Sequence, residues 1–216
     1  MLSEADELCT TPLKKDVERI ISSIEEAKRQ ADYAMVSIHA HESLNGNSAV
    51  PANFIKEFAR LCVDKGADAI IGHGPHELRG IEIYNGKPIF YSLGNFIFQT
   101  ETVAIQPADA YEKHSMSNLS TVGQYMSNRS KDGTRGYVVQ PNIWRSVMAG
   151  MTAVDGNIAR ICLHPITLHM EEPRSRKGWP SIIKSDKEEV LEYLASLSKP
   201  FGTELRIENN CALMDL

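Results

Sequence analysis

The pattern of apolar and polar positions predicts alternating helices and strands in the first hundred residues. Apolar residues recur at helical spacing over 13–30, directly after Pro12, a residue that often starts helices. The segment YAMVSIHA then has apolar residues on both faces, as a strand inside a covered sheet does. A second helix is expected between Pro51 and Gly66, followed by another buried strand, ADAIIG. Strand, helix and strand within about forty residues predict a right-handed unit with parallel strands.

Later segments are dominated by hairpin signals. Asn85-Gly86 separates GIEIY from KPIFYSLG, and Asp155-Gly156 lies inside RSVMAGMTAVDGNIARICLHPITL. Both dipeptides are typical of the type I′ turn that joins antiparallel strands. We also expect a short turn over 45–48, a loop over 173–180, a last helix over 185–198 and a closing strand at TELRIEN.

Residues from about 101 to 135 interrupt this pattern. They are rich in Ser and Asn and have weak periodicity, so we interpret them as a long polar insertion or mobile loop. The whole chain, 1–216, is then expected to form a single α/β domain that carries this insertion.

Composition excludes several classes of partner. The 216 residues carry 23 Lys and Arg against 28 Asp and Glu, a formal net charge of −5, with the two signs interspersed. We therefore expect no nucleic-acid partner. No apolar run approaches the roughly 20 residues that a membrane span needs, and the acidic start of the chain lacks the features of a signal peptide. The localisation stays unknown, with the cytoplasm as the default.

The four cysteines lie far apart in the sequence and form no C-x-x-C pair: Cys9, Cys62, Cys162 and Cys211. Cys62 falls on the apolar face of a predicted helix and Cys162 within a predicted strand, so we expect both to be packed thiols. The cysteines therefore indicate no particular chemistry.

Four of the seven histidines follow two apolar strands. His39 and His41 end YAMVSIHAHE, and His73 and His76 end ADAIIGHGPH. The carboxyl ends of neighbouring parallel strands meet at one edge of a sheet, where ligands bind, so we expect these imidazoles to lie close together. Neutral imidazole is a good ligand for Mn, Fe or Zn, and the pattern predicts a divalent metal site. The alternative is a set of hydrogen-bonded histidines at strand ends.

Nearby polar residues are candidates for catalysis or support. Glu42 could act as an acid or base or orient His39, or it could be a plain solvated carboxylate. Arg79 could bind a phosphate or carboxylate of a substrate, or be an exposed loop arginine. Asn95 could form a hydrogen bond near the site or cap its strand. The remaining histidines are expected to be structural: His114, His164 and His169.

The segments VSIHAHE and GADAIIGHGPHELRGIEIYNGKPIFYSLGNFIFQ resemble the CapA family of poly-γ-glutamate capsule-assembly proteins, which are similar to calcineurin-like metallophosphoesterases. The later segments SVMAGMTAVDGNIARICLHPITL and LEYLASLSKPFGTELRIEN also resemble that family, so the likeness covers roughly Lys14 to Met214. It implies a metallophosphoesterase-like layered α/β/β/α sandwich with a dinuclear metal site. Motifs similar to V-x-x-H-W-G-E and G-x-H-P-H imply metal ligands at His39 and His76, with Glu42 beside them.

The sequence departs from the family pattern at several positions. Gly74 stands where the last motif has its first histidine, so His73 would substitute, and His41 occupies a position that is usually glycine. The superfamily motifs Asp-x-His, Gly-Asp-x-x-Asp and Asn-His-Asp/Glu do not occur in the 38 residues before His39. The resemblance therefore implies the C-terminal portion of a CapA-like fold, without its N-terminal strands. An oligomer or a partner chain would supply those strands.

Three functions stay open from the resemblance. The first is a metal-dependent hydrolase that acts on a phosphoester or γ-glutamyl amide of a polyanionic or phosphorylated substrate. The alternative is a non-catalytic component of capsule polymer assembly that keeps the fold without the metal site. The third is an incomplete product with no activity of its own. Localisation is also left open, because the family is often associated with the cell envelope.

Overall fold

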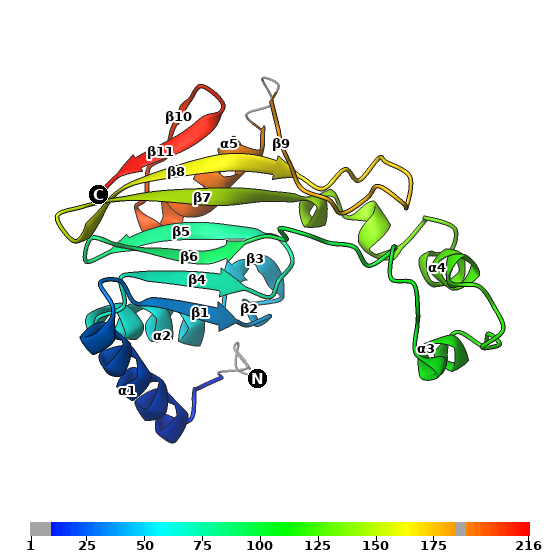
Figure 1. The fold of residues 1–216 in the computed structure, drawn as a ribbon, viewed down its shortest axis with the longest axis horizontal. Coiled ribbons are helices and arrows are strands. Elements are labelled where there is room, and N and C mark those ends of the chain that lie inside the picture. The colour runs from blue at the N-terminus through cyan, green and yellow to red at the C-terminus, as the bar shows by residue number, and fades with distance from the viewer. Residues whose placement is uncertain (1–9, 185–188) are drawn as a thin grey trace, which may run out of the picture.

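The computed structural model describes residues 10–184 and 189–216, and its first half forms a four-stranded sheet (Figure 1). The strands lie in the order β1 (Met35–His39), β4 (Ala69–His73), β6 (Lys87–Leu93) and β5 (Leu78–Tyr84). Strands β1, β4 and β6 are parallel, and β5 is antiparallel to β6. Helix α2 (Asn53–Asp64) connects β1 to β4, which confirms the predicted parallel unit. Helix α1 (Lys14–Gln30) precedes β1, as predicted.

Strand β1 lies at the edge of this sheet and not in its interior, so that expectation was wrong. Val36 and Ile38 pack against the helices, whereas Met35 on the other face is 53% exposed. In the described part of the chain, no strand pairs with the outer edge of β1. Apolar residues on both faces of a strand therefore did not distinguish an inner strand from an edge strand.

The turn expected over 45–48 is part of a small hairpin. Strands β2 (Ser43–Leu44) and β3 (Asn47–Pro51) pair antiparallel around Asn45 and Gly46, which both have positive φ. The hairpin directly follows the histidines at the end of β1 and precedes α2. It therefore belongs to the loops at the carboxyl edge of the sheet.

The second half of the chain forms a five-stranded sheet in the order β10-β11-β8-β7, with β9 paired to β8. Its strands are β7 (Arg145–Val154), β8 (Asn157–Thr167), β9 (Ser181–Ile182), β10 (Arg206–Glu208) and β11 (Cys211–Asp215). The β7–β8 hairpin confirms the turn predicted at Asp155-Gly156. Strands β9 and β11 were not predicted. Helix α5 (Glu189–Ser198) confirms the last helix from residue 189, and its predicted start over 185–188 lies outside the described residues.

Alternate residues of the four-stranded sheet pack into two cores. Ile70, Ile89 and Tyr91 contact the apolar faces of α1 and α2. Residues on the opposite face, including Leu78 and Phe90, share a core with α5 and the five-stranded sheet. Figure 1 shows α1 and α2 beside β1 and β4, and α5 behind the second sheet. The arrangement is a mixed α/β fold in which helices cover sheets.

Residues 101–135 are not an irregular loop, so of the two alternatives given for them, a long insertion or a mobile loop, the second was wrong. They contain helices α3 (Ala108–Lys113) and α4 (Val122–Ser130), and α4 begins with a capping box between Thr121 and Gln124. Tyr111, Tyr125 and Met126 form a small apolar cluster of their own. Figure 1 shows both helices standing away from the two sheets.

Three short 3₁₀ helices complete the described structure: Gly136–Val139, Pro141–Trp144 and Lys199–Phe201. The first two lead from the insertion into β7, and the third follows α5. No helix in residues 10–184 or 189–216 has the length and apolar character that crossing a membrane requires.

Candidate functional site

The four strand-end histidines lie together, and we call this group the histidine edge (His39, His41, His73 and His76). His39 and His73 are register partners at the ends of β1 and β4. Nε2 of His39 lies 3.2 Å from Nε2 of His41, and the ring centroids of His41 and His76 are 5.5 Å apart. The expected proximity of these imidazoles is therefore present, and their role as metal ligands stays a prediction.

Two glycines allow the strand ends to approach each other. A Cβ atom on Gly72 would lie 2.4 Å from the carbonyl oxygen of Tyr91, and one on Gly74 would lie 2.6 Å from that of Ala40. Gly74 also has φ +126°, which L-residues rarely adopt. The Ala40 amide donates to the His73 carbonyl at 2.9 Å, so the segment after β1 is held against the end of β4. The glycines of the Gly-His-Gly sequence thus allow the end of β4 to contact the backbone of its neighbouring segments closely.

Asn95 orients the imidazole of His76. Its Nδ2 donates to the carbonyls of His76 (3.1 Å) and Ile143 (3.0 Å), which fixes the amide so that Oδ1 faces Nδ1 of His76 at 2.9 Å. Because Oδ1 can only accept, Nδ1 carries the proton and Nε2 keeps its lone pair. This is the arrangement in which a histidine binds a metal through Nε2. The expected hydrogen bond of Asn95 near the site is confirmed.

The partial burial of His73 changes its pKa. Burial and then the nearby charge of His39 lower the pKa of His73 below its usual value. His73 is therefore a neutral imidazole near pH 7, the form that can donate a lone pair to a metal.

Arg79 is buried within β5, so the expectation of an exposed loop arginine was wrong. Nε donates to the Ser48 carbonyl (2.8 Å), and one terminal nitrogen donates to the carbonyls of Glu42 (3.0 Å) and His41 (3.3 Å). Burial lowers the pKa of Arg79 to about 10, and the charges of Glu77 and Glu42 oppose this shift. The guanidinium therefore holds the backbone that carries His41 in place, from beneath the histidine edge.

Glu42 is exposed. Among the residues that the structure describes, no hydrogen bond joins its carboxylate to His39; only its carbonyl is engaged, by Arg79 and the Ala52 amide. The solvated alternative matches this position, and an acid or base role for Glu42 stays a prediction.

The histidine edge by itself does not form a compact ligand set. Within residues 10–184 and 189–216, one group of His, Cys, Asp or Glu brings three ligand atoms within 4.8 Å of one another, and it lies elsewhere. His39 and His41 form a close pair, with His76 beside them. Any metal at this edge needs either a shift of these side chains or ligands from another segment.

The compact group consists of Cys162, His164 and Cys211 on the five-stranded sheet. Cys162 Sγ lies 3.5 Å from His164 Nε2. Burial, and then a hydrogen bond with the Cys211 thiol, raise the pKa of Cys162 to about 11. The sequence did not indicate that Cys162 and Cys211 lie together, because they are 49 positions apart. Cys62 is a fully buried thiol, as expected.

The other two histidines have structural partners. His114 lies 3.2 Å from Asn128 through Nδ1 and Oδ1, and His169 Nε2 lies 2.8 Å from Ser181 Oγ. These contacts agree with the structural role expected of them.

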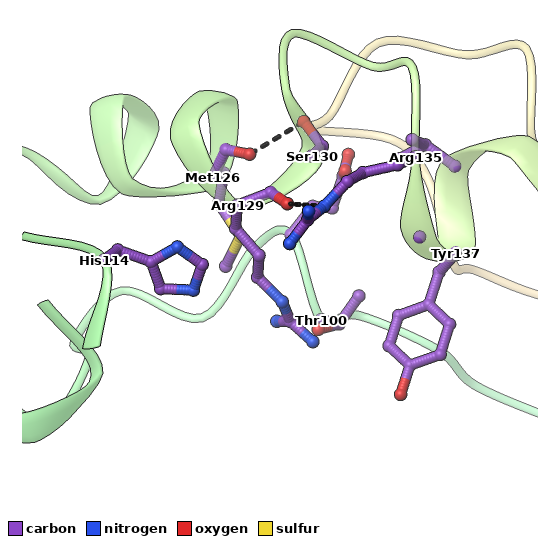
Figure 2. A pocket seen from close by; sticks show the side chains of 10 residues that line it. Thr100, His114, Met126, Arg129, Ser130, Arg135 and Tyr137 are labelled. Carbon is purple, nitrogen blue, oxygen red and sulfur yellow. Dashed lines mark hydrogen bonds between the residues drawn. The ribbon is translucent and has the colours of Figure 1, made fainter.

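A pocket of about 230 Å³ is formed mainly by residues of the insertion, and Figure 2 shows Arg129 and Arg135 among its lining side chains. The Arg129 guanidinium lies 5.6 Å from the centroid of the Tyr137 ring, which is 6.2 Å from the His76 ring. The Arg135 Nε donates to the Arg129 carbonyl at 3.3 Å. Two guanidinium groups thus border a cavity that is linked to the histidine edge through one aromatic ring.

Comparison with known proteins gives a family for this arrangement. The family model of the bacterial capsule synthesis protein PGA_cap matches residues 2–100. Residues 2–100 of the chain therefore match the capsule synthesis family to which CapA proteins belong. The matched region contains the whole histidine edge, and Asn95 as well.

Relatives agree with the family match. An uncharacterized protein of Sinorhizobium fredii is 35% identical over 209 residues, which cover 94% of this chain and 45% of the relative. The PGA biosynthesis protein CapA of Bacillus subtilis is 39% identical over 106 residues, 49% of this chain and 27% of the relative. A probable polyglutamine synthesis accessory protein of Mycobacterium tuberculosis is 34% identical over 97 residues, 44% of this chain and 25% of the relative. The chain therefore spans less than half the length of these relatives.

Proposed function

We propose that this chain supplies the histidine edge of a metallophosphoesterase-type hydrolase that acts in the metabolism of a capsule polymer. The observation that carries the proposal is the Asn95–His76 pair, which leaves Nε2 of His76 available beside the close pair His39 and His41. Relatives named for PGA and capsule biosynthesis support the pathway context.

In this proposal His39 and His76 hold a divalent cation, Mn, Fe or Zn, with His41 and His73 as further nitrogen donors. Imidazole suits all three metals. A bound cation would act as a Lewis acid at the bond to be cleaved and lower the pKa of water there. Gly72 and Gly74 keep the strand ends close, and Arg79 fixes the backbone beneath His41. Glu42, exposed at the same edge, would accept or donate a proton through its carboxylate.

The proposed substrate is a polyanion, with either a phosphoester or a γ-glutamyl amide as the bond cleaved. Arg129 and Arg135 border the pocket next to Tyr137, and guanidinium groups bind carboxylates and phosphates well. A negatively charged polymer could therefore lie across the insertion while one of its bonds reaches the histidine edge.

The free edge of β1 suggests where the remaining metal ligands come from. No described strand pairs with this edge, and unpaired edges accept strands from other chains. We propose that a second copy or a partner chain adds strands here and completes the site. Light scattering then shows an oligomer or a complex, and a stable monomer with full metal content would contradict this part of the proposal.

A non-catalytic role in polymer assembly is the second candidate. It is favoured by one observation: within the described residues, the histidine edge has no three ligand atoms within 4.8 Å of one another. In that case the arginine pocket binds the polymer and the histidines support the fold.

An activity assay separates the two candidates. The protein, in the oligomer or complex that light scattering identifies, is incubated with Mn²⁺, Fe²⁺ or Zn²⁺ and with either a phosphodiester or a γ-glutamyl amide chromogenic substrate, beside the His76→Ala variant. We expect metal-dependent turnover that the variant loses. Polymer binding without turnover under every metal condition, in protein that unfolds cooperatively, would support the assembly role instead.

A further inference from the structure

Cys162, His164 and Cys211 meet on the outer face of the five-stranded sheet. Cys162 and His164 alternate along β8, so both project from the same face, whereas Leu163 between them is fully buried in the core. Strand β11 pairs antiparallel with β8, with Ala212 opposite Leu163. Cys211 therefore lies opposite His164, on the same face and one strand away. All three side chains are half-buried.

The separation of the Cys162 and His164 ligand atoms matches that in a tetrahedral metal site. The three ligand atoms lie within 4.8 Å of one another, and Cys162 Sγ is 3.5 Å from His164 Nε2. Zn–S and Zn–N bonds of about 2.3 and 2.0 Å at a tetrahedral angle place sulfur and nitrogen about 3.5 Å apart. The backbone of two paired strands thus brings sulfur and nitrogen to the required separation without loop movement.

Ligand chemistry selects the metal. Two sulfur ligands and one imidazole suit Zn²⁺, whereas Mg²⁺ and Ca²⁺ prefer oxygen ligands. Three protein ligands leave one tetrahedral position free, and the half-exposed setting lets water fill it. The two thiols are also separate and reduced in the structure, so both sulfurs are available as ligands.

We propose that Cys162, His164 and Cys211 bind one Zn²⁺ ion. The site joins β11 to β8 and thereby fastens these two strands of the second sheet to each other. It lies on a different sheet from the histidine edge and does not depend on the proposed hydrolase.

Cobalt titration tests the site directly, because Co²⁺ replaces Zn²⁺ and its bonds to thiolate sulfur absorb in the near ultraviolet. The full chain, reduced beforehand, is titrated with Co²⁺ beside four variants: Cys162→Ser, Cys211→Ser, Cys62→Ala and His76→Ala. We expect a thiolate–cobalt band that saturates at one equivalent and that Zn²⁺ abolishes. Each serine variant should lose at least half of its intensity. The Cys62→Ala control and the His76→Ala variant should keep the full band, which separates this site from the histidine edge.

A thermal melt keeps the test decisive if a serine variant folds poorly. Zn²⁺ should raise the melting temperature of the wild-type chain, because a ligand that binds the native state stabilises it. The comparison is repeated in the His76→Ala background, so that the histidine edge does not contribute: the shift should remain there and should be absent once His164→Ala is added. The proposal is overturned if reduced wild-type protein shows no thiolate–cobalt band. It is also overturned if the band persists in the Cys162→Ser/Cys211→Ser double variant, or if these two cysteines form a disulfide that Zn²⁺ does not prevent.

Discussion

His76 and Asn95 form a 2.9 Å hydrogen bond that leaves Nε2 as the one imidazole nitrogen of His76 able to bind a ligand. The same Asn95 amide donates to the Ile143 carbonyl, on the segment that leads into β7. One asparagine therefore joins the end of β6, the strand-end loop of β4 and the start of the second sheet. The orientation of the proposed ligand depends on the packing of both halves of the chain.

Removing the Asn95 side chain should weaken metal binding without abolishing it. In the Asn95→Ala variant the His76 ring loses its fixed tautomer, and metal affinity should fall by about 10- to 100-fold, as it does for similar supporting residues. Asn128→Ala is a matched control, because Asn128 contacts His114 in the same manner at 3.2 Å. Competition with a fluorescent chelator measures both affinities. Equal losses in the two variants would contradict a specific role for Asn95.

Replacing Arg79 should destabilise the fold. In Arg79→Met, the carbonyls of Ser48, His41 and Glu42 lose their donor, and the free energy of unfolding should fall by about 3 kcal/mol. Urea denaturation gives this difference. The surface variant Arg176→Met, which breaks an exposed ion pair with Glu172, should change stability by less than about 1 kcal/mol. A similarly small effect at Arg79 would show that the histidine-bearing segment is held by other contacts.

Acid should weaken the junction between α1 and β4 through Asp68. Burial raises the pKa of Asp68, but hydrogen bonds from Lys28, the Ala34 amide and Lys87 outweigh it, so that its pKa lies below the ordinary value of 3.8. Because the folded-state pKa is lower than the unfolded one, the stabilisation is complete above about pH 4 and is lost as the pH falls through the folded-state pKa.

Unfolding experiments between pH 7 and pH 2 test this prediction. Asp68→Asn should lower stability by about 3 kcal/mol at pH 7, and its stability should then depend less on acid than that of the wild type. Asp215→Asn is the control. Asp215 also forms an ion pair, with Arg160, but this pair lies at the exposed surface, where solvent screens it. If the two variants have the same pH profile, Asp68 does not determine the acid sensitivity.

Deleting 108–134 and bridging the gap with a short Gly-Ser linker should leave the two sheets folded. The insertion has an apolar cluster of its own, formed by Tyr111, Tyr125 and Met126. This cluster is separate from both main cores, so its removal should leave them packed. Circular dichroism and urea unfolding should show a cooperative transition. The variant should also bind a polyglutamate chain more weakly, because it lacks Arg129. Loss of cooperative unfolding would mean that the insertion belongs to the core.

Local patterns predicted most of the elements. The 3.6-residue period located α1 and α2, and the dipeptides at Asn85 and Asp155 located two hairpins, because these signals depend on neighbouring residues alone. Whether β1 is an inner or an edge strand depends on which strands pair with it, and its composition does not encode that. The short helices of the insertion were not predicted, because each contains too few apolar positions to show a helical period.

The candidate site divides in the same way. Strand ends predicted that the four histidines meet, since parallel strands place their ends at one edge. The burial of Arg79 was missed because a charged residue in a strand is usually exposed, and only the fold supplies the three carbonyls that surround it. Cys211 lies 49 positions after Cys162, and only the pairing of β8 with β11 makes them neighbours.

The metal content of the histidine edge tests the proposed function most directly. It is measured by mass spectrometry of the purified Cys162→Ser/Cys211→Ser variant, so that the second proposed site binds no metal. The chain is exchanged into metal-free buffer after loading with Mn²⁺, Fe²⁺ or Zn²⁺. Beside it are His39→Ala, His76→Ala and the control His169→Asn, which removes a histidine bonded to Ser181. We predict at least one bound metal ion per chain. The bound metal should be lost in both alanine variants and retained in the control. A folded chain that retains no metal, or one whose metal content is unchanged by His39→Ala and His76→Ala, would contradict a metal site at the histidine edge.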